Sequence, residues 1–189
     1  MPQSLRALAA MLLAMAAGCG ATVPATNETE GSRTMDNATI ARLSLTSDAF
    51  QDGQPIPRQY TCDGDDQTPA LGWGEPPPGT RSFALVIDDP DAPNGIFRHW
   101  GVYDIPVSAR SIGGGSKTGS EATNDFGKPG YGGPCPPIGH GTHHYHFKLF
   151  ALSVDKLGLP ANPKVLDIET AAKKHALAEG ELIGTYERR

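Results

Sequence analysis

Short apolar segments of strand length, separated by connections rich in glycine and proline, constrain the fold of this chain more than any other feature. Three such segments are "SFALVIDD" at 82–89, "HWGVYDIP" at 99–106 and "HHYHFKLFALSV" at 143–154, and Leu43 and Leu45 alternate with polar residues before them. The 23 glycines and 17 prolines provide many turns between strands. The pattern predicts a β-rich domain, a sandwich of two sheets, with a minor helical part.

One helix is predicted, near the end of the chain. Residues 167–179, "DIETAAKKHALAE", are rich in alanine, carry acids in the first turn and are followed by Gly180, which can end a helix. A last short strand is expected at 181–187, "ELIGTYE". The two tryptophans, Trp73 and Trp100, are expected in the core.

The length and charge of the chain limit its class. With 189 residues, the chain is long enough for one domain with a substantial core and too short for two of ordinary size. Its formal charge of −5 argues against nucleic acid as a partner, because binding to nucleic acid phosphates needs a basic face. Any site for an anion must therefore be local.

The N-terminal residues have the features of a lipoprotein leader. Residues 1–18 carry Arg6 and then the apolar run "ALAAMLLAMAA", which is shorter than the about 20 residues that span a bilayer. The end of this run, "AMAAGCG", favours cleavage before Cys19 and lipid attachment to that cysteine. An ordinary signal peptide cleaved nearby and an uncleaved buried helix are the alternatives. Residues 19–41 are small and polar, typical of a flexible tether, and 42–189 form the expected domain.

If Cys19 carries lipid, an even pair of cysteines remains. Cys62 and Cys135 would lie in a compartment where disulfides persist, so a bridge between them is the leading interpretation and two separate thiols are the alternative. No two cysteines are close enough in sequence for a C-x-x-C redox or zinc motif.

Three segments collect the unusual polar residues. They are Asp88, Asp89 and Asp91 around Pro90, then His99, and then "GYGGPCPPIGHGTHHYHF" at 130–147. Alternate residues of an extended strand share a face, so His143 and Tyr145 end an apolar face where a pocket floor is expected. His144 and His146 are expected to face water.

Metal, cofactor and catalytic sites have little support. The histidines at 140, 143, 144 and 146 suggest a metal cluster, but strand parity points them to opposite faces, so no three meet without a distant ligand. The sequence has no G-x-S-x-G elbow, and "GGGSKT" lacks the order of a phosphate-binding P-loop. We therefore expect no metal, no cofactor and no catalytic residue, although a triad assembled in space stays open.

The polar segments suit a small ligand that carries both charges. Glycine N–H groups can approach an anion, prolines stiffen their loop, histidines and a tyrosine can donate to phosphate oxygens, and aspartates attract an attached amine. Taken alone, each segment has a plainer interpretation, because Asp-Pro-Asp is a common turn and a single buried histidine is more often a core residue. The candidate ligand residues are Asp89, Asp91, His99, Gly132, Gly133, Pro137, His143 and Tyr145.

Four blocks of the sequence together resemble the phosphatidylethanolamine-binding protein family, in its bacterial Raf-kinase-inhibitor-like branch. They are "YTCDGDDQTPALGW", "DDPDAPNGIFRHW", "NDFGKPGYGGPCPP" and "GHGTHHYHFKLFAL", in family order between about Leu43 and Tyr186. The resemblance implies a large central antiparallel sheet packed against a smaller sheet, with a few peripheral helices and an anion-binding pocket at one end of the strands. By motif it assigns to that pocket Asp89, Asp91, His99, Pro137, His143 and Tyr145.

Two departures from the family pattern matter. The family usually has arginine where this sequence has His144, so a salt bridge made by the arginine is expected to be absent or dependent on pH. The sequence ends at Arg189 without the longer C-terminal helix of the eukaryotic members, which leaves their partner-regulated pocket closure unsupported here.

The first functional expectation is a binding protein without catalytic activity, anchored by lipid outside the cytoplasm, that holds phosphate or a phosphoethanolamine-like head group. The alternative, taken from inhibitors in the family, is a regulator of an envelope protein partner such as a protease. A hydrolase that uses His99 and Asp89 is the third interpretation. The protein is expected to face the periplasm or the cell exterior, and Gly20 after Cys19, in place of an aspartate, favours an outer membrane.

Overall fold

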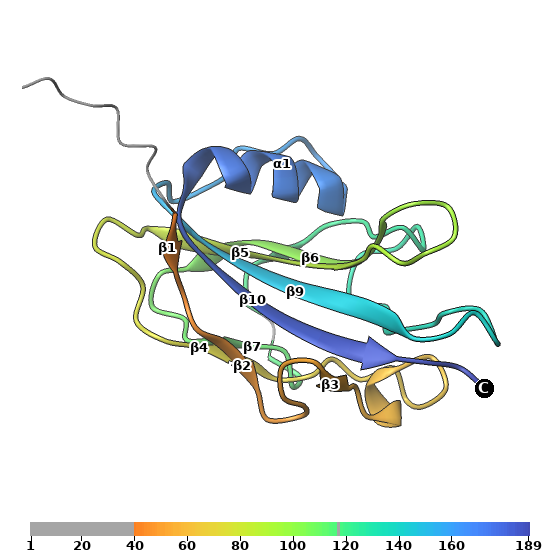
Figure 1. The fold of residues 1–189 in the computed structure, drawn as a ribbon. Helices are drawn as coiled ribbons and strands as arrows, with labels where there is room; N and C mark the ends of the chain where they lie inside the picture. Colours follow the sequence, from red (N-terminus) through yellow and green to blue (C-terminus); the bar gives the residue numbers. More distant parts are fainter. Residues whose placement is uncertain (1–39, 117) are drawn as a thin grey trace, which may run out of the picture. The chain divides into compact units, whose positions relative to one another are not determined.

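Two β-sheets and one α-helix form the framework of the described residues (Figure 1). The computed structural model describes residues 40–116 and 118–189, so the predicted signal peptide, Cys19 and most of the predicted tether lie outside the described residues. The large sheet has seven strands in the order β1-β10-β9-β5-β6-β8, and β3 also pairs with β10. Its strands are β1 (Ala41–Arg42), β3 (Gln54–Pro55), β5 (Ser82–Asp89), β6 (Phe97–Pro106), β8 (Ser120–Glu121), β9 (His143–Leu152) and β10 (Ala176–Tyr186).

The smaller sheet and two helices complete the described elements. This sheet joins β2 (Leu45–Ser47), β4 (Leu71–Trp73) and β7 (Ser111–Ile112), and the helices are the 3-10 helix η1 (Arg58–Tyr60) and α1 (Val165–His175). The predicted fold class, mainly β with a large and a smaller sheet, is confirmed. In detail, one α-helix flanks the sheets in the described residues, and β1 and β3 pair with β10 in parallel. Of the described residues, no helical segment has the length and apolarity needed to cross a bilayer.

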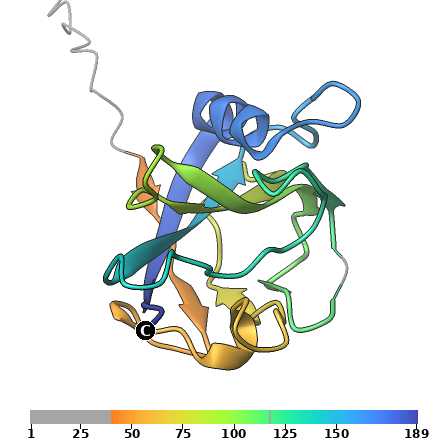
Figure 2. The same cartoon turned by 90° about the vertical axis from the view of Figure 1, so that its right-hand side faces the viewer.

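Side chains that alternate along the strands build two separate cores. On β5, Phe83, Leu85 and Ile87 belong to the core shared with the smaller sheet, and Ala84 and Val86 belong to the core under α1. Figure 2 shows α1 and the smaller sheet on opposite sides of the large sheet. Both tryptophans lie in the first core, as predicted. Because β5 is buried on both faces, the position of its end is fixed by packing from both sides.

The end of the predicted helix is a strand. The helix α1 ends at His175 and β10 begins at the next residue, so the helix predicted at 167–179 is wrong in its last turn. Residues 176–180 pair with β9 instead. A Cβ on Gly180 would lie 2.5 Å from the carbonyl oxygen of Leu43. Glycine is needed there for the close approach of the N-terminal segment, and not to end a helix.

A disulfide joins the loop after η1 to the loop before β9. Cys62 and Cys135 are bonded, with Cα atoms 5.4 Å apart and 73 residues of separation. The N–H group of Cys62 also donates to the carbonyl oxygen of Pro134 at 3.1 Å. The two loops are therefore held together by a covalent bond and a hydrogen bond next to each other.

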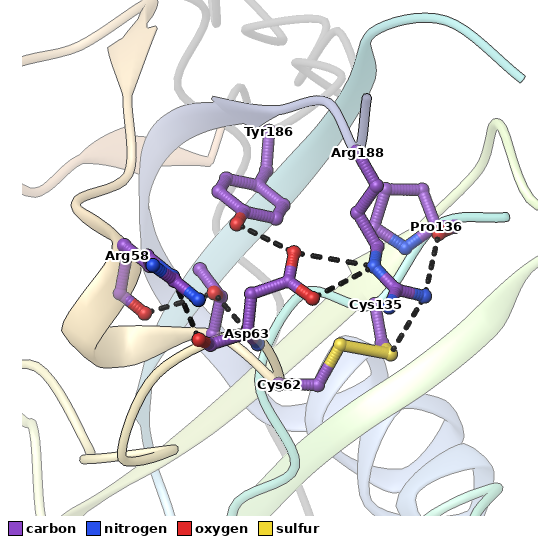
Figure 3. Close-up of polar contacts among 8 residues, drawn as sticks. Arg58, Cys62, Asp63, Cys135, Pro136, Tyr186 and Arg188 are labelled. Atoms are coloured by element: carbon purple, nitrogen blue, oxygen red, sulfur yellow. Dashed lines mark hydrogen bonds and ion pairs between the residues drawn. A yellow bond between two sulfur atoms is a disulfide. The ribbon is translucent and has the colours of Figure 1, made fainter. Parts of the chain in front are cut away.

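The last residues of the chain brace the same loops. The Asp63 carboxylate accepts hydrogen bonds from the Tyr186 hydroxyl at 2.8 Å and from Arg188 Nε at 3.0 Å (Figure 3). The Arg188 guanidinium also donates to the carbonyl oxygen of Pro136 at 3.4 Å. We call Asp63, Tyr186 and Arg188 the C-terminal clamp. It connects the end of β10 to both partners of the disulfide.

Candidate functional site

Polar residues from three strands meet at one end of the large sheet, where β5 ends and β6 and β9 begin. Asp89 ends β5, His99 lies near the start of β6, and His143 and Tyr145 lie at the start of β9. All four are buried, with between 0 and 3% of each residue exposed. The shared buried face of His143 and Tyr145 agrees with the predicted strand parity. We call these four residues the strand-end cluster, and Figure 2 looks onto this end of the sheet.

The His99 ring is neutral and has one free nitrogen. Its Nδ1 lies 2.7 Å from the carbonyl oxygen of Gly132, and because a carbonyl group only accepts, Nδ1 carries the proton. Burial lowers the pKa of His99 below its ordinary value, so Nε2 is an unprotonated acceptor at neutral pH. The expectation that His99 donates to phosphate changes accordingly. In this tautomer, Nε2 can accept a hydrogen bond and cannot donate one.

The His143 ring has both nitrogens in hydrogen bonds. Its Nδ1 lies 2.7 Å from Asp89 Oδ2, and its Nε2 lies 2.8 Å from His140 Nδ1. The carboxylate accepts, so Nδ1 of His143 carries a proton, and Nε2 shares a hydrogen bond with Nδ1 of His140. Asp89, His143 and His140 thus form a hydrogen-bonded chain from the buried cluster to an exposed residue.

The Tyr145 hydroxyl is buried without a hydrogen-bond partner in the described residues. Burial raises the pKa of Tyr145, and the charge of nearby Asp89 adds to the rise, so the phenol keeps its proton at neutral pH. Asp89 is close enough to act on this hydroxyl but is not in hydrogen-bond geometry with it. The Tyr145 and His99 ring centroids lie 5.2 Å apart. A buried hydroxyl without a partner is costly unless something else satisfies it.

The glycine N–H groups that the sequence analysis offered to an anion are already donated within the protein. The N–H of Gly132 donates to the His99 carbonyl oxygen at 3.1 Å, and the N–H of Gly133 donates to Asp66 Oδ1 at 2.6 Å. A Cβ on Gly133 would lie 2.3 Å from the carbonyl oxygen of Tyr60. These glycines therefore permit close packing of the loop. Pro137 is exposed, and its carbonyl begins the turn that carries His140.

Asp91 lies outside the strand-end cluster and pairs with His144. Its Oδ2 accepts from the His144 N–H at 2.9 Å and from His144 Nδ1 at 2.7 Å, and both side chains are about half exposed. The hydrogen bond from the His144 ring holds the pKa of Asp91 below its ordinary value. His144, at the position where the resemblance led us to expect arginine, thus forms an ion pair or hydrogen bond with an aspartate.

The remaining histidine of the predicted water-facing pair also binds a carboxylate. His146 lies on the opposite face of β9 from His143, as predicted, but it is partly buried and its Nδ1 lies 2.8 Å from Glu181 Oε1. Across residues 40–116 and 118–189, no three side chains of His, Cys, Asp or Glu are placed to share a metal ion.

Several residues of the site were not singled out from the sequence. Asn124 is buried and donates from Nδ2 to the carbonyl oxygens of His99 at 3.2 Å and Gly130 at 2.9 Å. The Phe126 ring packs against His99 with centroids 5.4 Å apart. Both belong to the block "NDFGKPGYGGPCPP", so the block itself was the available signal. Asp66 and His140 gave no periodic signal because both lie in loops.

A groove of about 560 Å³ lies away from this cluster, along β1, β9 and β10 beside α1. Its lining includes three bases and three acids: Arg42, Lys148, Lys173, Asp52, Glu179 and Glu181. Lys148 is already paired with Asp88 at 2.7 Å, and Lys173 with Glu169 at 2.7 Å. The groove has equal numbers of acids and bases, and two of its three bases are already paired, so the strand-end cluster is the stronger candidate.

Comparison with known proteins places the chain in a family. The family model described as phosphatidylethanolamine-binding protein matches residues 46–187, which include the whole strand-end cluster. The chain belongs to the phosphatidylethanolamine-binding protein family. Among solved structures, a phosphatidylethanolamine-binding protein homologue of Chlamydia trachomatis has a TM-score of 0.71 and 33% identity, covering 80% of this chain and 100% of that one. The family member YbcL of E. coli has a TM-score of 0.72 and 30% identity, covering 79% of this chain and 100% of that one.

Two relatives of known sequence agree with this family, and one of these relatives is named as a lipoprotein. A UPF0098 protein of Aquifex aeolicus is 48% identical over 157 residues, which cover 78% of this chain and 90% of that protein. A protein of Mycobacterium tuberculosis that is named as a lipoprotein, LppC, is 42% identical over 147 residues, which cover 77% of this chain and 72% of that protein. The family is described as a family of binding proteins.

Proposed function

We propose that the strand-end cluster binds the phosphate group of a small zwitterionic ligand such as phosphoethanolamine. The observation that carries the proposal is the Tyr145 hydroxyl, which is buried without a partner beside the His99 ring. A phosphate oxygen that accepts from this hydroxyl would remove an otherwise costly buried donor. The family name of the matching model supports a ligand of this class.

The donors and acceptors of the cluster match a phosphate that carries one proton. Tyr145 can donate, and Nε2 of the neutral His99 ring can accept. A phosphate monoester with one P–OH group supplies the opposite pair, since its P–OH donates to His99 and another of its oxygens accepts from Tyr145. A fully ionised phosphate has no proton to donate to the Nε2 lone pair, and its negative charge is repelled by the Asp89 carboxylate. Both effects are unfavourable in a buried site.

Asp89 favours a ligand that carries an amine as well. Its Oδ2 accepts from His143 and its Oδ1 accepts from the N–H of Asp91 at 2.9 Å. Each carboxylate oxygen can accept a second hydrogen bond, so an ammonium group beside the phosphate can be paired there. The negative charge of Asp89 then attracts the amine and disfavours a bare phosphate dianion.

Calorimetric titration of the full chain with phosphoethanolamine, inorganic phosphate and ethanolamine tests this function. We expect the strongest binding for phosphoethanolamine, weaker binding for phosphate and none detectable for ethanolamine, because the phosphate contacts are the buried ones. The phosphoethanolamine should be recovered unchanged, as expected for binding without turnover. Equal heats for all three compounds, or none for any, would contradict the proposal, and release of phosphate from phosphoethanolamine would favour a hydrolase.

The affinity for phosphoethanolamine is expected to fall as pH rises. The lowered pKa of His99 keeps its Nε2 unprotonated, so the ligand must bring the shared proton. The second pKa of a phosphate monoester is about 6, so the protonated form, and with it the affinity, should decrease about tenfold for each pH unit above that value. Titrations at pH 6, 7 and 8 measure the slope. A constant affinity over this range would contradict the proposal that the ligand supplies the proton shared with His99.

Lipid anchoring through Cys19 belongs to the same proposal. The residues "AMAAGCG" before and around Cys19 and the lipoprotein name of the mycobacterial relative both support it. Replacing Cys19 with alanine should move the protein from the membrane fraction to a soluble fraction outside the cytoplasm, because the acyl chains are then lost. Fractionation followed by a salt wash measures this. A Cys19→Ala protein that stays on membranes after the wash would contradict the anchor.

Exposed apolar side chains support a second candidate, the binding of a protein partner in the cell envelope. Ile138 and Phe126 are 69% and 46% exposed, on two loops that carry site residues, and Ile96 before β6 is 51% exposed. Exposed apolar side chains that gather on one end of a protein are typical of an interaction surface. A partner captured from an envelope extract by the wild type, and lost with Ile138→Glu while phosphoethanolamine binding is unchanged, would support this role.

A further inference from the structure

The Nε2 nitrogen of His143 is hydrogen-bonded to another side chain of the same protein. Nε2 of His143 lies 2.8 Å from Nδ1 of His140, with ring centroids 5.0 Å apart. We propose that His140 is a gate that competes with the ligand phosphate for His143 Nε2, an inference that rests on the proposed phosphate-binding function. The ligand binds fully when His140 swings out and a phosphate oxygen takes its place.

Asp89 makes this competition exclusive. Its bond to Nδ1 fixes the His143 tautomer, which leaves Nε2 as the one nitrogen that can exchange partners. A single proton lies between two nitrogens 2.8 Å apart, so His143 Nε2 can hold His140 or a ligand oxygen but not both. A ligand oxygen at this position takes the place of His140 Nδ1 as the hydrogen-bond partner of Nε2. The exchange therefore replaces one partner with another and needs no change at Asp89.

The turn that carries His140 can move without disturbing the core. His140 is exposed and lies between Gly139 and Gly141, whose φ values are +76° and +91°. A Cβ on either glycine would meet no atom within 4 Å, so the turn is not packed against neighbours. Two backbone bonds hold it, from His140 N–H to the Pro137 carbonyl oxygen and from Gly139 N–H to the Arg188 carbonyl oxygen, each at 3.1 Å. Glycine on both sides gives this turn alternative backbone conformations.

The charged groups around the gate have partners of their own. Asp91 is paired with His144 on β9, Glu187 accepts from the Thr142 hydroxyl, and the Arg188 guanidinium is bound in the C-terminal clamp. Asp89, from β5, is the charged side chain that contacts the His140–His143 pair directly, through His143. The exchange at His143 Nε2 thus depends on His140 and the ligand. It affects a single hydrogen bond.

Substituting His140 gives the test. In calorimetric titrations of the full chain with phosphoethanolamine, His140→Ala should bind about two- to tenfold more tightly than the wild type, because one competing hydrogen bond is gone. His140→Gln, whose amide can still form a hydrogen bond with Nε2, should lie between the two. His146→Ala is the matched control, because His146 is on the same strand as His143 but bonds to Glu181 on the opposite face; its affinity should equal that of the wild type.

A second measurement reports on the gate itself. In long-range ¹H–¹⁵N spectra of the histidine rings, saturating phosphoethanolamine should remove the proton shared by His140 and His143 in the wild type. Weaker or unchanged binding by His140→Ala, with wild-type thermal unfolding, would overturn the gate while leaving the phosphate site intact. Persistence of the shared proton at saturation would overturn it too. If neither the wild type nor His140→Ala binds phosphoethanolamine or phosphate, the proposed function fails, and the gate fails with it.

Discussion

Replacing Cys62 and Cys135 together with alanine is expected to lower the free energy of unfolding by about 4 kcal/mol. The reason is the sequence separation of 73 residues between them, because a cross-link over a loop of this length removes much of the entropy of the unfolded chain. Loss of the bridge also frees the two loops that the C-terminal clamp contacts. Unfolding in urea, followed by circular dichroism, measures the difference.

Reduction of the disulfide in the wild-type protein is the control for this prediction. Wild-type protein unfolded in the presence of dithiothreitol should match the double variant, and the double variant should be insensitive to reductant. Mass mapping of the unreduced wild type should find one peptide pair linked through Cys62 and Cys135. Two free thiols in that map, or a double variant as stable as the wild type, would rule out the stabilising bridge.

The substitution His99→Ala should weaken binding of phosphoethanolamine by about ten- to hundredfold. Hydrogen bonds to charged groups contribute about 1.5–3 kcal/mol, and the ring supplies the buried acceptor of the proposed site. Calorimetry at pH 6, where the singly protonated phosphate is abundant, gives the largest signal. His99→Gln keeps a polar group of similar reach and should lose less than the alanine variant.

Thermal unfolding curves and a control variant at another position distinguish the loss of a binding contact from general damage to the fold. His99 is 3% exposed and packs against Tyr145 and Phe126, so each variant needs a thermal unfolding curve beside its titration. His146→Ala serves again as the control and should bind like the wild type. If the folded His99→Ala protein binds phosphoethanolamine as tightly as the wild type, His99 is a buried core histidine and the site assignment is wrong.

The long strands could be predicted from the sequence because each is long enough to show a period. The run at 82–89 is β5, and the run starting at 143 is β9. The strands β1, β3, β7 and β8 have two residues each and therefore no period of their own. They form only because a distant segment offers backbone partners. The same cause turned residues 176–179 from helix to strand, since pairing with β9 outweighs the helix propensity of alanine and glutamate.

Strand parity predicted which side chains share the buried face but not how they bond. It placed His143 and Tyr145 together because a strand alternates by two residues. It carried no information on His140, whose contact depends on the conformation of a loop. The tautomer of His99 depends on a carbonyl 33 residues away, and the Gly133 N–H is taken by Asp66 at a separation of 67 residues. Contacts of this kind are set by the folded chain as a whole.

The place of β10 in the large sheet bears on when this chain can fold. It is the last strand in the order of the described residues, yet it lies inside the sheet, with β9 on one side and β1 and β3 on the other. Until β10 is present, one edge of β9 is unpaired and β1 has no partner strand. The large sheet is then incomplete. Pairing of residues 41 and 178 also makes the final contacts very distant in sequence, which slows folding. The large sheet can therefore form in full only after residues 176–186 have been synthesised.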